Sequence, residues 1–72
     1  MRTYKEEKPL VGGWYSVRFT STLTKEQREP ENLTRTFIDF AEFDADKSEW
    51  DAPEYKKLGF YVQDIIKQEP TN

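Results

Sequence analysis

The sequence predicts a small α+β domain, mostly β, in which an antiparallel meander of three to four strands carries one short helix. Three observations support this fold class. Residues 14–22 (WYSVRFTST) alternate between apolar and polar side chains, which is typical of a strand with one buried face. Residues 34–44 (TRTFIDFAEFD) carry apolar side chains on both faces, which is typical of a central strand. Residues 51–59 carry helix-capping signals.

The chain has 72 residues and is expected to fold as one domain over residues 1–72. A domain of this size buries only about 60% of its unfolded surface, so its stability depends on a few large aromatic side chains. Residues 1–9 are polar and end at a proline, so we expect a loose N-terminal arm with Tyr4 as its anchor. Residues 68–72 are expected to form a frayed tail.

Two polar segments connect the expected strands. Residues 22–32 contain Thr24 and Gln27, a candidate capping box, followed by Pro30, so a short helix and a solvated loop are both open. Residues 45–48 form a turn by composition, after which a short return strand begins.

The short helix is expected over residues 52–58. Asp51 is the expected N-cap, Pro53 lies in the first turn, and Gly59 follows the helix. Residues 60–66 (FYVQDII) are rich in β-branched and aromatic side chains, which favours a last strand. The apolar residues of that segment are also spaced by four, so a helix is the alternative.

The composition excludes several kinds of chemistry. The chain has no Cys and no His, which removes disulfides, thiolate metal sites and imidazole catalysis. We expect no cofactor and no metal. No apolar run approaches the roughly 20 residues of a membrane span, and the first residues lack a signal peptide's apolar stretch. We therefore expect a cytoplasmic protein that does not bind membranes.

Charge is distributed unevenly along the chain. Residues 1–36 carry seven basic and five acidic side chains, whereas residues 37–72 carry nine acidic and four basic ones. An acidic chain is a poor match for phosphate backbones, so direct binding to nucleic acid is not expected. An alternative function follows from the same charge: an acidic mimic of nucleic acid that blocks a basic DNA- or RNA-binding site.

Two acidic patterns suggest chemistry, but structural explanations fit them better. Residues 44–48 place oxygen ligands at positions 1, 3 and 5 of a calcium loop, yet Glu49 stands where that loop needs glycine. Asp39, flanked by apolar residues, is a candidate acid or base, but an ion pair with Arg18 or Arg35 also explains it. We expect the protein not to be an enzyme.

The surplus of apolar residues in the second predicted strand is the main functional signal. Phe37, Ala41 and Phe43 share one face, Ile38 and Phe40 share the other, and one short helix cannot cover both faces. Either the arm and the long loop cover the second face, or a partner does, as a homodimer or as another protein. Partner-binding candidates combine aromatic and acidic side chains: Trp14, Phe43, Asp44, Asp46, Glu49, Trp50, Asp51 and Tyr55.

Several short motifs follow one another along the chain: Pro9 with Gly12-Gly13, then Tyr15-Ser16-Val17, then Phe40-Ala41-Glu42-Phe43-Asp44, then Trp50. This order resembles a small, uncharacterised β-rich domain common in phage and prophage proteins. The chain departs from it in lacking a Trp-containing segment before the proline and a closing Trp around Asp64-Ile65. The resemblance implies a phage- or prophage-encoded protein in the host cytoplasm and carries no activity. We expect an accessory or modulator that binds a host or phage protein.

Overall fold

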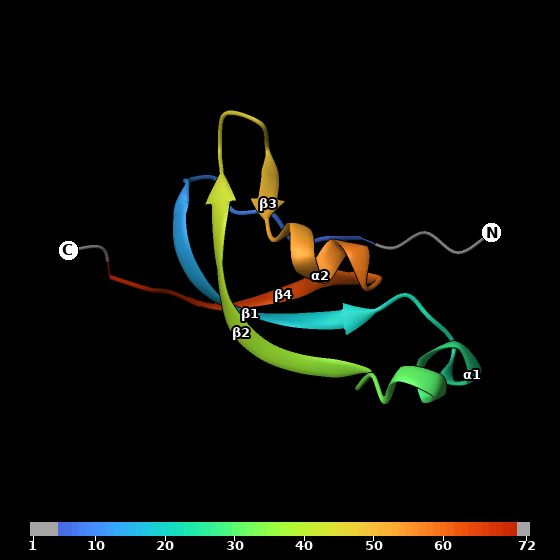
Figure 1. Ribbon diagram of the computed structural model, residues 1–72. Helices are drawn as coiled ribbons and strands as arrows, with labels where there is room; N and C mark the ends of the chain where they lie inside the picture. Colours follow the sequence, from blue (N-terminus) through green and yellow to red (C-terminus); the bar gives the residue numbers. More distant parts are fainter. Residues whose placement is uncertain (1–4, 71–72) are drawn as a thin grey trace.

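The structure is a computed structural model that describes residues 5–70 of the chain. Its elements follow in the order β1 (Gly13–Ser21), α1 (Lys25–Arg28), the 3₁₀ turn η1 (Glu29–Glu31), β2 (Thr36–Asp44), β3 (Glu49–Asp51), α2 (Pro53–Lys57) and β4 (Phe60–Gln68). The strands form a curved sheet, with α2 packed against it and α1 at one end (Figure 1). The predicted fold class, a mostly β antiparallel sheet with a short helix on it, is confirmed.

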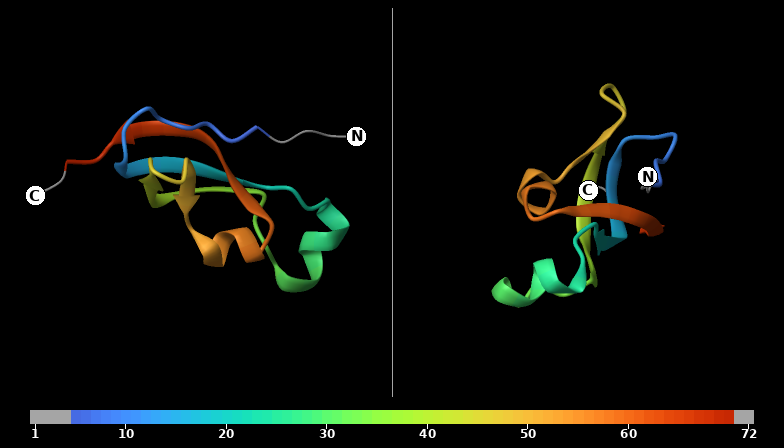
Figure 2. Two further views of the ribbon diagram at one scale, coloured as in Figure 1. Left: turned by 90° about the horizontal axis from the view of Figure 1, so that it is seen from above. Right: turned by 90° about the vertical axis from the view of Figure 1, so that its right-hand side faces the viewer.

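The sheet has the strand order β3-β2-β1-β4, and all neighbouring strands are antiparallel. The first three strands follow one another as the predicted meander, whereas β4 returns to the far side of β1 and does not lie beside β3. After the three residues of β3, α2 carries the chain across one face of the sheet to the start of β4 (Figure 2). The segment 60–66 is therefore a strand, and its helical alternative is wrong.

The hydrophobic core lies on the face of the sheet that α2 covers. From β1 it contains Tyr15, Val17 and Phe19, the three residues that the alternation places on one face. The remaining core residues come from the later elements: Ala41, Phe43, Trp50, Ala52, Phe60 and Val62. The ring of Tyr55 in α2 stacks obliquely on Phe19, with 4.7 Å between ring centroids, so the helix is held to the sheet by aromatic contact.

Part of the opposite face of the sheet, on the β2 side, is open to solvent. Ile38 and Phe40 of β2 are 62% and 60% exposed, and Trp14 at the start of β1 is 46% exposed. The prediction that β2 carries more apolar surface than the fold covers is therefore confirmed. Within the described residues, the alternative in which the arm and the long loop cover this face is wrong, because residues 5–9 and the loop lie elsewhere (Figure 2).

Residues 5–9 lie against the sheet. The backbone N–H of Glu7 donates to the carbonyl of Val62 in β4 at 3.2 Å, and the Trp50 indole N–H donates to the carbonyl of Glu7 at 2.8 Å. One residue of the arm thus connects β4 to β3, the two outer strands. The predicted anchor of the arm, Tyr4, lies outside the described residues. At the other end the sheet extends to Gln68, and the next residue still donates its N–H to the Trp14 carbonyl at 2.8 Å.

Two of the three predicted helix-end signals are present in the structure, and one is not. Thr24 and Gln27 form both hydrogen bonds of a capping box, so the helical alternative for this connection is the one observed. The N-cap of α2 is Ala52, and the prediction of Asp51 is wrong because that residue pairs with Glu42 in the sheet. Gly59 follows α2 with φ of 86°, the left-handed conformation that glycine adopts most easily.

Candidate functional site

One edge of β2 is paired along only part of its length. β2 pairs with β1 from Thr36 to Phe43, but β3 pairs with only the last three residues of β2. Within residues 5–70, no other strand pairs with that side of residues 37–41. The register sets Glu42 opposite Asp51, so a longer β3 would set Pro53 opposite Phe40. Because proline has no N–H to donate to a ladder and is suited to the first turn of a helix, α2 begins there and the edge stays open.

Asp39 lies at the centre of the open edge, and both of its carboxylate oxygens accept hydrogen bonds. Oδ1 accepts from the backbone N–H of Phe40 at 2.7 Å, and Oδ2 accepts from the hydroxyl of Tyr55. The hydrogen bond to Asp39, together with burial and the charges of Asp39 and Glu54, raises the pKa of Tyr55 above its usual 10.0. The carboxylate therefore holds α2 to β2 and caps a peptide group of the free edge.

The ion pair predicted for Asp39 is replaced by this arrangement. Arg18 pairs instead with Asp64 across the β1–β4 ladder, with 3.4 Å between guanidinium and carboxylate. The side chain of Arg18 lies on the face opposite to the core, like its neighbours Ser16 and Thr20, whereas Asp39 faces α2. A salt bridge between Arg18 and Asp39 is ruled out by this difference in side-chain direction. Among the described residues, Asp39 forms no ion pair with Arg35 either.

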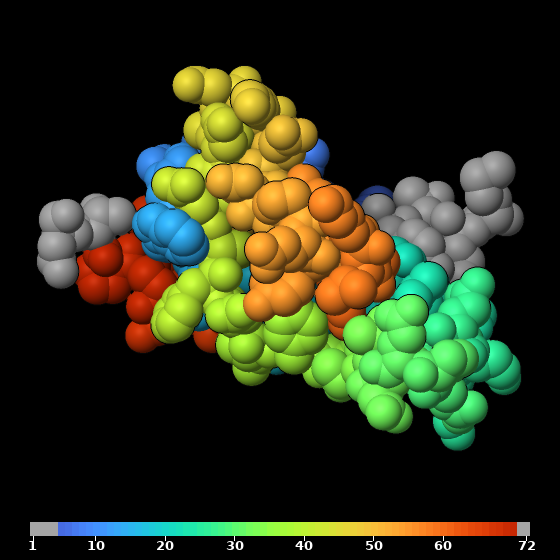
Figure 3. All heavy atoms as spheres, viewed as in Figure 1, coloured from blue at the N-terminus to red at the C-terminus, as the bar shows by residue number. Residues whose placement is uncertain are grey.

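A concavity of about 240 Å³ lies along the open edge, and we call it the edge groove. Its lining comes from three parts of the chain: Trp14, residues 39–41 and residues 51–55. Trp14 and Phe40 supply exposed aromatic surface on one side, and the start of α2 forms the other side. In Figure 3 the surface of β2 (yellow-green) runs between the start of β1 (blue) and α2 (orange).

The edge groove is acidic. Asp39, Asp51 and Glu54 lie in its lining, and none of the described residues that line it is Lys or Arg. The two lysines of α2, Lys56 and Lys57, are in its last turn and line a different concavity next to the α1 loop. Three carboxylates beside exposed aromatic rings give a surface that attracts a cationic and partly apolar group.

The structure divides the predicted partner-binding residues into three groups. Trp14, Asp51 and Tyr55 meet in the edge groove. Phe43 and Trp50 are core residues, 4% and 1% exposed, so their predicted role on a partner surface is corrected to a role in packing. Their side chains lie on the covered face because each strand alternates, and the T-shaped contact between their rings has 5.1 Å between centroids.

The remaining predicted residues lie in and beside the β2–β3 turn. Asp44 accepts the backbone N–H groups of Asp46 and Lys47 on one oxygen, at 3.0 and 3.2 Å. This is the polar turn that the sequence favoured over a calcium loop. Asp46 and Glu49 are exposed there and do not line the edge groove.

Six lining residues of the edge groove were missed as binding candidates: the buried Ala41 and Ala52, and the residues Asp39, Phe40, Pro53 and Glu54. The signal that could have found them is the proline two residues after a three-residue strand. A proline at that distance ends the pairing with β2, so the neighbouring backbone of β2 must face solvent or a partner. The sequence indicated Asp39 as a candidate acid or base and not as a partner-binding residue.

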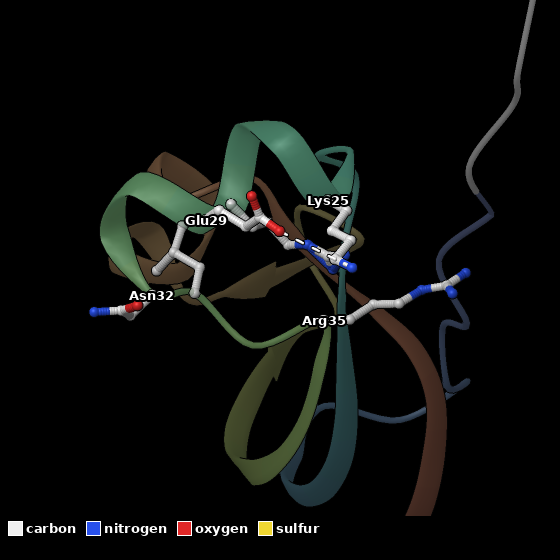
Figure 4. A pocket seen from close by; sticks show the side chains of 6 residues that line it. Lys25, Glu29, Asn32 and Arg35 are labelled. Carbon is white, nitrogen blue, oxygen red and sulfur yellow. Dashed lines mark ion pairs between the residues drawn. The ribbon is translucent and has the colours of Figure 1, made fainter.

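A second concavity of about 290 Å³ lies at the basic end of the molecule, lined by residues of α1 and the following loop. Lys25 and Glu29 form an ion pair across it at 4.0 Å, while Asn32 and Arg35 point away from that pair in opposite directions (Figure 4). The four side chains labelled in Figure 4 therefore do not converge on one ligand position.

Two further observations concern metals and membranes. Within residues 5–70 no three Asp or Glu side chains are grouped closely enough to hold a metal ion. In the same part of the chain, no helix has the length and apolar character needed to cross a membrane.

No known protein family, curated protein or solved structure gave a significant match to this chain.

Proposed function

We propose that this chain is a small protein-binding module, an accessory or modulator that captures a segment of another protein in the edge groove. The observation that supports the proposal is the coincidence of an open strand edge, exposed aromatic rings and three carboxylates in one concavity. Exposed aromatic surface beside such an edge is typical of recognition sites for other chains. Binding is favoured over catalysis because both oxygens of Asp39 already accept hydrogen bonds.

A phage or prophage origin, with a host protein as the partner in the cytoplasm, is part of the proposal and derives from the motif order alone. The edge groove adds the chemistry of the contact. A partner segment needs an apolar group for Trp14 and Phe40 and a cationic group for the acids on the α2 side. Both requirements can be tested without knowledge of the natural partner.

The test is a selection from a random peptide library on the immobilised chain, followed by sequencing of the enriched peptides. We expect enrichment on the wild-type chain, loss of enrichment on Phe40→Ser, and retention on Ile66→Ser. Ile66 is a matched control because it is also an exposed apolar strand residue, 45% exposed, outside the edge groove. Far-UV circular dichroism confirms that both variants are folded. Equal enrichment on Phe40→Ser, or none on the wild type, would contradict the proposal.

The alternative function, mimicry of nucleic acid, depends on the whole acidic run from Asp39 to Glu54, of which the edge groove holds three members. It requires the exposed carboxylates beside the β2–β3 turn, such as Asp46 and Glu49, to contact a basic site. Reversing these two charges should then abolish binding, and binding should weaken steeply with salt. If the edge groove is the site, the same two substitutions leave the enrichment unchanged, whereas Glu54→Lys reduces it.

A further inference from the structure

The open edge of β2 has a fixed hydrogen-bonding direction. In an antiparallel ladder, alternate residues direct both peptide groups to the same neighbour. Glu42 faces β3, so Phe40 and Ile38, two and four residues earlier, direct their N–H and C=O groups to the same side. Within residues 5–70 no strand occupies that side, and the N–H of Phe40 is bonded to the carboxylate of its neighbour Asp39. The edge therefore offers the peptide groups of two residues to an incoming chain.

The side chains on either side of this edge differ in chemistry. Ile38 and Phe40 point to the open face, where Trp14 also lies. Asp39 points to the opposite side, where Tyr55 and the start of α2 lie. A strand beside β2 would set its alternate side chains on these same two faces. Residues opposite Ile38 and Phe40 would contact apolar surface, and the residue between them would meet the carboxylate of Asp39.

We propose that the edge groove binds an extended peptide in which apolar residues alternate with Lys or Arg. This proposal rests on the proposed function. The peptide adds to β2 as an antiparallel strand and continues the line of β3 beyond the point where Pro53 ends it. Its apolar side chains pack on Phe40 and Ile38. The basic side chain that lies opposite Asp39 binds its carboxylate, which then releases the N–H of Phe40 to the peptide.

A second copy of the chain fits this edge less well than a basic peptide. In a symmetric antiparallel pair of two β2 edges centred on this segment, each Asp39 would lie opposite the other. The Glu54 and Asp51 side chains of both copies would add to that repulsion, because all three acids line the same groove. The charge of the groove thus favours a cationic partner over self-association.

The test uses the full chain and the pentapeptide acetyl-Lys-Val-Lys-Val-Lys-amide in an NMR titration of ¹⁵N-labelled protein. We expect binding, with the largest amide shifts at Ile38 and Phe40. Two N-methylated isomers are matched in charge and composition. Methylation of both valine nitrogens removes the N–H groups that face β2 and should weaken binding at least about tenfold. Methylation of the two outer lysine nitrogens places the methyl groups on the solvent side and should leave the affinity unchanged.

Replacing every lysine of the peptide by glutamine tests the charge without altering the protein, and we expect affinity to fall. Equal affinities of the two N-methylated isomers would overturn strand addition, and equal affinity of the glutamine peptide would overturn the cationic preference. The proposed function survives either result if the library selection still depends on Phe40. No binding of the pentapeptide, with successful selection of unrelated sequences, would refute this ligand class alone. A dimer in sedimentation that the peptide cannot dissociate would assign the edge to a second copy and refute the inference.

Discussion

The strongest test of the fold compares the two tryptophans of the chain. Trp50 is 1% exposed, and its ring lies in T-shaped contact with Tyr15 and Phe43, at 5.6 and 5.1 Å between centroids. Trp50→Ala should cost about 3–5 kcal/mol through lost burial and the cavity left behind. Loss of the indole hydrogen bond to Glu7 adds about 1 kcal/mol. A domain of this size has a free energy of unfolding of about 4–11 kcal/mol, at about 0.05–0.15 kcal/mol per residue.

We therefore expect Trp50→Ala to be largely unfolded at 37 °C, and Trp50→Phe to lose about 1–2 kcal/mol. Trp14→Ala is the control, because Trp14 is 46% exposed on the opposite face and should cost less than about 1 kcal/mol. The assay is urea denaturation followed by far-UV circular dichroism, with the free energy taken from the transition midpoint and slope of each variant. If Trp14→Ala costs as much as Trp50→Ala, the assignment of the buried face is wrong.

Three further predictions concern the contacts around the core. Tyr55 has a pKa above 10.0 in the folded chain, so its contribution to stability is complete below pH 10 and is lost as pH rises through the folded pKa. Tyr55→Phe should therefore reduce the loss of stability above pH 10 in urea titrations. Tyr61→Phe, which also removes one phenol, is the control and should reduce that loss less. Gly59→Ala should destabilise the folded chain by about 1 kcal/mol or more, because φ is 86° and an added Cβ would lie 3.1 Å from Leu23 Cγ. Thermal unfolding measures this, and an unchanged melting temperature would contradict it. Deletion of residues 1–8 removes both main-chain hydrogen bonds of Glu7 and should lower the free energy of unfolding by about 1–3 kcal/mol in the same assay. The fluorescence of Trp50 should shift to the red. Wild-type stability would show that the arm does not hold the outer strands.

Much of the fold could be predicted from the sequence because the signals are local. The alternation of Tyr15, Val17 and Phe19 with polar residues determines which face of β1 is buried. The capping box at Thr24 and the glycine at position 59 act within one turn of the chain and were readable without the fold. The place of β4 beside β1 was not predictable in this way, because pairing between residues 39 to 53 positions apart depends on the direction that α2 gives the chain.

The site could be predicted only in part, for a related reason. The sequence showed that β2 has apolar residues on both faces, but it did not show which face α2 covers. Phe43 and Trp50 are therefore in the core, while Phe40 is exposed, although all three are aromatic residues in or next to β2. The exposure of a side chain depends on which element packs over its face of the sheet. A pattern with a period of two shows which residues share a face, but it does not show which of the two faces is covered.

Pro53 links the fold to the proposed function. A residue with an N–H at this position would let β3 continue past Asp51 and would pair with Phe40, which would close the edge of β2 with the chain itself. Proline instead starts α2, which supplies Tyr55 to the core and Glu54 to the groove. The same residue thus completes the cover of one face and leaves the neighbouring edge open. Asp39 caps one peptide group of that edge and adds charge to it. In the binding mode that we propose, this charge disfavours self-association and leaves the edge to a basic strand.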